Sequence, residues 1–156
     1  MVKQAPLPDF GIYFRTSRRS PIDFVCRETP NLLHDMVFLR GYLHDATFDT
    51  DDVSLTGSVL RIRMNRDRWE LYKAPGELES IITKLTIRSV LSLKWRAKPK
   101  IAEKFFVRDV YLGESFWDNS DKAEVVLSGF GKSPSQLRIV VREPFAIRLQ
   151  DVSRRK

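Results

Sequence analysis

Two His-Asp dipeptides are the residues of this chain best suited to hold a metal ion. They are His34-Asp35 and His44-Asp45, and they contain the only two histidines of the 156-residue sequence. An imidazole and a carboxylate together can bind a divalent metal, which can activate water for hydrolysis. With the acidic stretch 49–52 close by in sequence, the two pairs could supply a hydrolytic metal centre.

The same dipeptides resemble the motif of the HD-type phosphohydrolases. In that family the ligands lie in a helical bundle and include a further distant His and Asp, whereas the rest of this chain has a β-rich pattern. A helix across residues 34–44 would rotate the second pair by about 1000°, which is some 80° away from the first. We therefore favour capping or hydrogen-bonding roles for both pairs. His44-Asp45 is the better candidate for a role in structure or function, because it stands where an apolar run meets a predicted strand.

Other enzyme motifs are incomplete in this sequence. Residues 49–52 begin like a calcium-binding loop, but the position that should be glycine is Ser54. Gly131-Lys132-Ser133 matches only the end of a phosphate-binding loop, whose first glycine would stand at Val126. The single cysteine, Cys26, has no base beside it in sequence. We therefore expect a protein that acts without catalysis and without a cofactor.

The charge of the chain brings a polyanionic partner into consideration. The sequence has 27 Lys and Arg residues against 20 Asp and Glu, which gives a net charge of +7. Positive charge follows the predicted strands, whereas negative charge follows connections such as 44–57 and 109–124. A basic surface attracts nucleic acid and other polyanions. The same distribution would also let loop carboxylates neutralise the strand residues, and the sequence leaves both arrangements open.

The candidate polyanion-binding residues occupy the polar side of predicted strands. Because side chains alternate along a strand, one side of each would be cationic. The seven candidates are Arg61, Arg63, Arg88, Lys94, Arg96, Arg138 and Arg142. Proteins that bind single-stranded nucleic acid also place aromatic residues on the exposed side, whereas Trp95 falls on the apolar side. Nucleic-acid binding is therefore an alternative that we rank below a neutralised, solvated face.

A second group of candidates surrounds exposed tryptophans. Trp and Arg are enriched at protein interfaces, and the stretch 65–70 concentrates charge around one tryptophan. The interaction candidates are Arg66, Arg68, Trp69 and Trp117. The simpler interpretation is that the two arginines form ion pairs with Asp67 or Glu70.

These candidates must be positioned by β-strands, and the clearest strand covers residues 84–96. Apolar residues there occupy mainly odd positions and polar residues even positions, which is typical of a strand with one buried and one exposed face. The alternation places Leu91, Leu93 and Trp95 in the core. The alternation is interrupted once, near Ser89, and residues 84–96 are too many for an ordinary strand. We therefore expect a bulge at Ser89.

Further strands are expected where short alternating runs are bounded by turn residues. Together with 81–95 they are residues 46–49, 59–65, 69–72, 105–112, 123–128, 137–142 and 145–149. Short connections exclude most parallel crossovers. The predicted fold class is mainly β, at the margin of α+β: a single antiparallel, meander-type sheet that forms a sandwich or barrel. One short helix is expected near 31–43, with a buried strand as the alternative.

The sequence predicts one β-rich domain across residues 31–156, preceded by an extended N-terminal arm across 1–30. Four prolines interrupt regular structure in this arm, although it has room for one short edge strand. We see no secretion signal and no apolar run long enough to span a membrane, so we expect a cytoplasmic protein that does not bind membranes.

A non-catalytic binding domain is the function that these observations favour, with a protein or a small ligand as its partner. Polyanion binding through the cationic strand faces is the first alternative, and metal-dependent hydrolysis at the His-Asp pairs is the second. Long strands with apolar faces can also pair at their edges, which makes a homodimer a further possibility.

Overall fold

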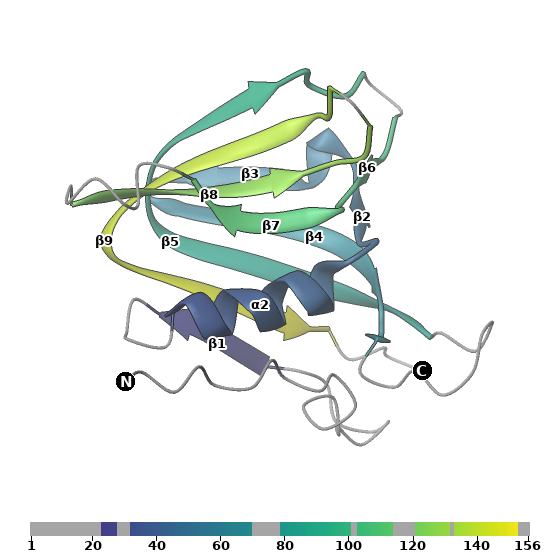
Figure 1. Ribbon diagram of the computed structural model, residues 1–156, viewed down its shortest axis with the longest axis horizontal. Helices are drawn as coiled ribbons and strands as arrows, with labels where there is room; N and C mark the ends of the chain where they lie inside the picture. Colours follow the sequence, from purple (N-terminus) through teal and green to yellow (C-terminus); the bar gives the residue numbers. More distant parts are fainter. Residues whose placement is uncertain are drawn as a thin grey trace, which may run out of the picture.

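Alternating apolar and polar residues fold into one curled antiparallel sheet, a half-barrel, against which a single helix packs (Figure 1). The computed structural model describes residues 23–27, 32–69, 79–100, 103–113, 121–131 and 133–152. The predicted fold class, mainly β with one short helix, is confirmed. The predicted strand at 69–72 falls largely outside the described residues, as does most of the predicted arm.

The elements agree closely with the predicted ones, with three differences. In chain order they are β1 (Asp23–Arg27), α2 (Leu32–Leu43), β2 (Thr47–Phe48), the short 3₁₀ helix η1 (Thr50–Asp52), β3 (Val53–Thr56), β4 (Val59–Asp67), β5 (Ser80–Arg96), β6 (Phe105–Phe106), β7 (Asp109–Leu112), β8 (Lys122–Ser128) and β9 (Gln136–Asp151). The sequence pattern missed β3. It divided β9 into two strands, and it joined β6 to β7.

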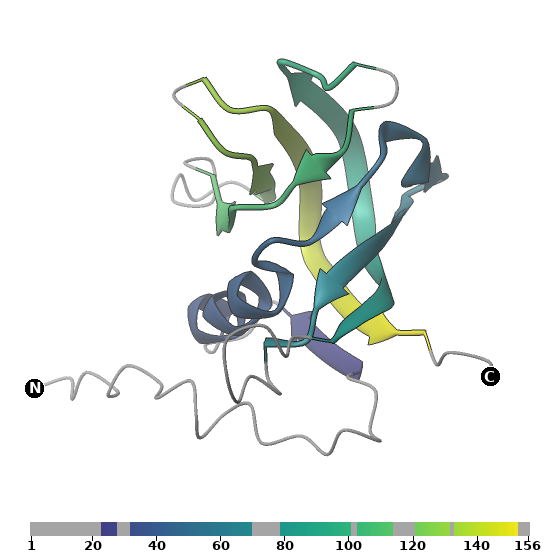
Figure 2. The same ribbon diagram turned by 90° about the vertical axis from the view of Figure 1, so that its right-hand side faces the viewer.

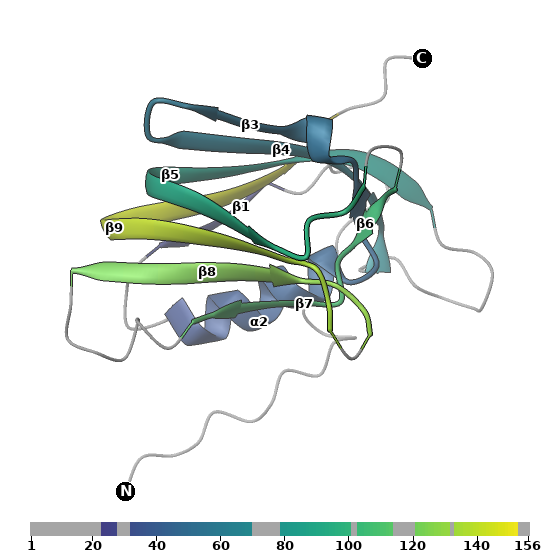
Figure 3. The same ribbon diagram turned by 90° about the horizontal axis from the view of Figure 1, so that it is seen from above.

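The predicted meander is present in two parts, which the two longest strands connect. The sheet order is β6-β2-β4-β5-β9-β8-β7, while β1 also pairs with β9 and β3 also pairs with β4. Thus β3, β4 and β5 form one meander, and β7, β8 and β9 form the other. The pairing of β5 with β9 joins them along almost the whole length of both strands. Figure 3 shows β4, β5 and β9 side by side.

The bulge expected near Ser89 is confirmed. Ser89 has a φ of 66°, in the left-handed region. The pairing of β5 with β9 shifts between Arg88 and Val90, and it shifts again between Val90 and Ser92. Each shift reverses the side of the sheet that the following residues face.

These two shifts correct the position predicted for Leu91. Val90 is buried in the core, and Leu91, which simple alternation placed inside, is 42% exposed. After the second shift the predicted alternation is restored, because Leu93 and Trp95 pack against the core. The outer side of β5 therefore carries one apolar residue between its cationic ones.

The half-barrel is bridged at its open side by residues 105–112, which we call the bridging segment. Its first part pairs with β2, and the Val107 amide donates a hydrogen bond to the Ala46 carbonyl (2.8 Å). Its second part pairs with β8, and the Arg108 amide donates to the Ser128 carbonyl (2.8 Å). One continuous stretch of chain thus connects the two ends of the sheet order.

Helix α2 fills one end of the curled sheet, as Figure 2 shows. Leu32, Met36, Leu39 and Leu43 recur at helical spacing and are all buried in the core that the inner sheet residues form. The helix contacts β1, β4 and β7. Because this packing covers the inner side of the sheet, the outer side is the one that remains for function.

Candidate functional site

Five basic residues lie together on the outer side of β4, β5 and β9, and we call this set the cationic outer face. Its members are Arg61, Arg63, Lys84, Arg88 and Arg148, all of them exposed. The residues that alternate with them, such as Ile62 and Ile87, are fully buried. The period of two along each strand therefore places the basic side chains in solvent and fixes the face.

The strand register brings like charges directly opposite each other on this face. Arg63 pairs with Lys84, and Arg61 lies in one row with Thr86 and Arg148. Neighbouring strands are about 4.8 Å apart. Like charges that oppose each other across strands cost a few tenths of a kcal/mol up to about 1 kcal/mol. Water screens the repulsion between these side chains, and a bound anion would reduce it further.

Four of the five members of this face have no carboxylate within salt-bridge distance among the described residues. Arg61, Arg63 and Lys84 form no salt bridge there, and the same holds for Arg88. The inner side chain Asp151 is buried and bonded elsewhere. Of the two outcomes left open by the sequence, an uncompensated face or a face cancelled by loop carboxylates, this region shows the first.

A second basic cluster on the same side of the sheet is neutralised in part. Lys94 opposes Arg138 across β5 and β9, but Arg138 forms a salt bridge with Glu124 (2.5 Å). Arg142 lies 3.6 Å from Asp121. Arg96, at the end of β5, is exposed. The seven predicted polyanion-binding residues thus share the outer side. Arg138 and Arg142 lie beside carboxylates, whereas the other five form no salt bridge within the described residues.

The predicted interaction candidates lie mainly inside the protein. Arg66 is 0% exposed and donates two hydrogen bonds to Asp151, from Nε to Oδ1 (2.9 Å) and from Nη2 to Oδ2 (2.7 Å). Arg68 is also buried, with its Nη1 atom 3.5 Å from Glu79. These two arginines therefore offer little surface to a partner.

The two tryptophan candidates have different outcomes. Trp69 donates a hydrogen bond to the His44 carbonyl (2.7 Å), and its ring meets the imidazole edge to face, with centroids 5.6 Å apart. It therefore holds the end of α2 against the strand end after β4. Trp117 lies outside the described residues.

The two His-Asp pairs are each intact but do not converge. In the first, Nδ1 of His34 is 4.0 Å from Asp35, and in the second Nδ1 of His44 is 3.2 Å from Asp45. Ten residues of helix separate them by about 15 Å along the axis. Across the described ranges, no three His, Cys, Asp or Glu side chains come close enough to share a metal ion. The geometry therefore gives no support to a shared metal site, and only the second pair is close enough for a local polar contact.

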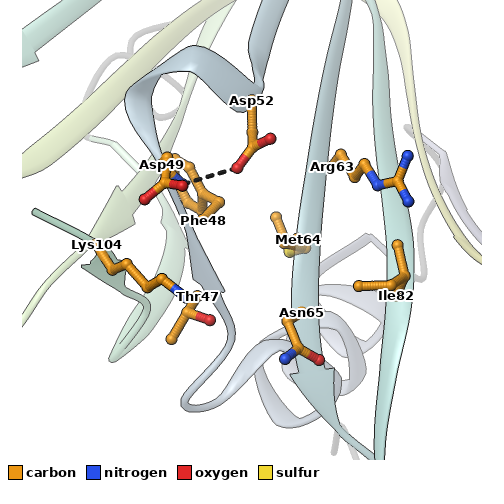
Figure 4. Close-up of a pocket in the computed structure, with 9 residues that line it drawn as sticks. All are labelled: Thr47, Phe48, Asp49, Asp52, Arg63, Met64, Asn65, Ile82 and Lys104. Atoms are coloured by element: carbon orange, nitrogen blue, oxygen red, sulfur yellow. Dashed lines mark hydrogen bonds between the residues drawn. The ribbon is translucent and has the colours of Figure 1, made fainter. Parts of the chain in front are cut away.

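Figure 4 shows a shallow pocket of about 180 Å³ at the margin of the cationic outer face. Arg63 and Lys104 line it together with Asp49 and Asp52. The two acidic residues close the η1 turn, where the Asp49 amide donates to Oδ2 of Asp52 (2.9 Å). The stretch that begins like a calcium-binding loop is therefore a polar turn, in which Asp52 has a structural role.

A second pocket, of about 260 Å³, lies where the end of α2 meets the bridging segment and the β8–β9 loop. Arg40, His44 and Arg108 line it, and so does Asp109, which is 3.0 Å from Nε of Arg40. The pocket is therefore basic, although one of its cations already has a carboxylate beside it.

Sequence reasoning missed two members of the cationic outer face. Lys84 and Arg148 both lie on the polar side of predicted strands, so alternation could have found them. Their position beside Arg61 and Arg63 could not be found, because it depends on the register of β4 with β5 for Lys84 and on the pairing of β9 with β5 for Arg148.

Comparison with known proteins adds no further information. No family model, curated protein or solved structure matches the chain. Among the described residues no helix has the length and apolar character needed to cross a membrane.

Proposed function

We propose that this protein is a non-catalytic binding domain that holds a polyanion on its cationic outer face. The observation that carries the proposal is a group of four exposed cations, Arg61, Arg63, Lys84 and Arg88, that form no salt bridge within the described residues. Arg63 directly opposite Lys84 is the clearest case. A surface with this charge pattern is stabilised when phosphate or sulfate groups bind, because the anions replace the missing carboxylates.

Two further observations favour this ligand class over a small molecule. The two pockets formed by described residues, of about 180 and about 260 Å³, are smaller than ordinary ligand pockets, which measure roughly 300–1,000 Å³. Both are shallow and lined by charged residues, whereas small-molecule sites are mostly apolar. An extended anion that lies across strands needs no deep pocket.

Retention on heparin tests the proposal. The unaltered chain should bind at low salt and elute as salt rises, because counterions are released when a polyanion binds. The double variant Arg61→Gln, Lys84→Gln should elute at clearly lower salt. With a nucleic-acid ligand, the slope of log K against log salt should fall by about 1.4 to 1.8 for the two lost contacts.

A matched variant controls for net charge alone. Arg138→Gln with Arg142→Gln also removes two positive charges, but both arginines lie beside carboxylates, so their loss should shift elution much less. Equal shifts for the two double variants would show that total charge, and not this face, governs binding. Failure of the unaltered chain to bind heparin at low salt would refute the proposed function.

A further inference from the structure

Residues 104–108 place aromatic and basic side chains alternately on the outside of the protein. Lys104, Phe106 and Arg108 are exposed, while Phe105 and Val107 between them are buried. Phe105 anchors this alternation, since its ring lies 5.0 Å from that of Phe48 in the core. The phenyl ring of Phe106 is 51% exposed.

A second exposed phenyl ring lies beside this segment. Phe130, in the β8–β9 loop, is 52% exposed, and the Arg108 guanidinium lies 5.8 Å from its ring centroid. The loop is held close because Gly129 packs against Phe105 and the Phe106 carbonyl, where a Cβ atom would be 3.5 Å from both. We call Lys104, Phe106, Arg108 and Phe130 the aromatic-cationic strip.

The strip continues into the cationic outer face. Phe106 pairs with Thr47, which pairs with Asn65, two residues from Arg63 on the same side of β4. Lys104 and Arg63 line the same shallow pocket (Figure 4). Two strand spacings, or about 10 Å, separate Phe106 from Asn65. A single extended ligand could therefore contact both surfaces.

Two half-exposed phenyl rings among basic residues suit one kind of polyanion in particular. Proteins that bind single-stranded nucleic acid combine a basic surface for the backbone with aromatic rings on which bases stack. In a duplex the base faces are covered by their neighbours, and a sulfated polysaccharide has no bases. Stacking on an exposed phenyl ring therefore favours single-stranded nucleic acid over a duplex and over a sulfated polysaccharide.

We infer that the aromatic-cationic strip stacks the bases of single-stranded nucleic acid while the cationic outer face holds its phosphates. This inference rests on the proposed polyanion-binding function and specifies its ligand. The contact of Arg108 with Phe130 leaves the opposite side of that ring for a base. Specificity for one base sequence is not expected, because every base has a face that can stack.

Fluorescence anisotropy with labelled oligo-dT and oligo-U of about 15 nucleotides tests the inference. Phe106→Leu with Phe130→Leu keeps apolar side chains but removes both aromatic faces, and it should weaken binding of at least one probe about fivefold or more. Phe106→Trp with Phe130→Trp should retain the affinity of the unaltered chain. The two probes distinguish DNA from RNA as the preferred strand.

The control variant is Leu55→Ala, which removes an exposed apolar side chain from β3, outside the strip. It should bind the oligonucleotides like the unaltered chain. Heparin retention should be the same for the leucine and tryptophan variants, because no charge changes. An unchanged thermal transition confirms that the leucine variant is folded.

The outcomes separate the two proposals. If the leucine variant binds both oligonucleotides as tightly as the unaltered chain while heparin retention persists, the stacking inference is overturned and polyanion binding stands. An unaltered chain that prefers duplex DNA of the same length over both single strands would also overturn it. If the unaltered chain binds neither heparin nor oligonucleotide, both proposals fail.

Discussion

Replacing Asp151 with alanine would leave the Arg66 guanidinium buried without its bidentate partner. Both side chains are 0% exposed, and the two hydrogen bonds between them measure 2.9 and 2.7 Å. The pair joins the end of β9 to β4, two strands away across the sheet. Arg66 would keep its hydrogen bond to the Asp67 carbonyl (3.3 Å) and its contact with the Tyr42 ring, but it would lose the carboxylate that balances its charge in a place that solvent does not reach.

We expect Asp151→Ala to lower the free energy of unfolding by about 3–5 kcal/mol. For a chain of this size that corresponds to a fall in Tm of roughly 6–20 °C. Urea and thermal unfolding, followed by circular dichroism, measure both quantities. Asp121→Ala is the matched control, because it removes an exposed carboxylate 3.6 Å from Arg142 and should cost no more than about 1 kcal/mol.

The double variant Arg66→Met, Asp151→Leu tests the reasoning further. Replacing both charges with apolar groups removes the unpaired charge, so this variant should be much more stable than Asp151→Ala. If Asp151→Ala cost less than about 1 kcal/mol, or if the double variant were no more stable than the single one, the pair would not be the buried interaction described above.

Two other predictions concern charge and backbone. Glu124→Gln removes the carboxylate that neutralises Arg138, so it should raise the salt concentration at which the protein elutes from heparin; unchanged or earlier elution would contradict the neutralising role. Gly57→Ala should lower the free energy of unfolding by about 1–2 kcal/mol in urea titrations, because Gly57 has a φ of 61° and open space around it leaves backbone strain as the only cost. No loss of stability would show that the turn adopts another conformation.

Local periodicity was sufficient to predict most strands and the helix. The runs at 59–65 and 123–128 lie within β4 and β8, and the helical spacing from Leu32 to Leu43 agrees with α2. The break at Ser89 also predicted the bulge. Its effect on Leu91 could not be predicted, since two register shifts depend on how β9 pairs with β5. β3 was missed because most of its residues are exposed and provide no alternation of burial.

The candidate site was predictable only in part. Alternation placed Arg61, Arg63 and Arg88 on the outer side, as observed. It could not show which basic residues have carboxylates beside them, because Glu124 reaches Arg138 through the pairing of β8 with β9. Lys104, Phe106 and Arg108 alternate with apolar residues in the sequence, so the pattern predicts that they share one face. The aromatic candidates were limited to tryptophan, and Phe106 was therefore not among them.

Arg66 illustrates the opposite difficulty. Its position next to Asp67 suggested a local ion pair at the surface, whereas alternation along β4 places it inside with Ile62 and Met64. Its partner, Asp151, is 85 positions away in sequence. A charged residue on the apolar side of a strand signals a buried partner, but only the tertiary structure identifies it.

The bridging segment has a consequence for self-association. Unpaired strand edges recruit other chains, and proteins limit aggregation by covering them. Residues 105–112 pair with β2 through β6 and with β8 through β7. They therefore cover one edge of β2 and one edge of β8, which would otherwise be open to another chain. Among the described strands β1, β3, β6 and β7 each have a single strand partner, so a homodimer built by strand addition would use one of these four edges.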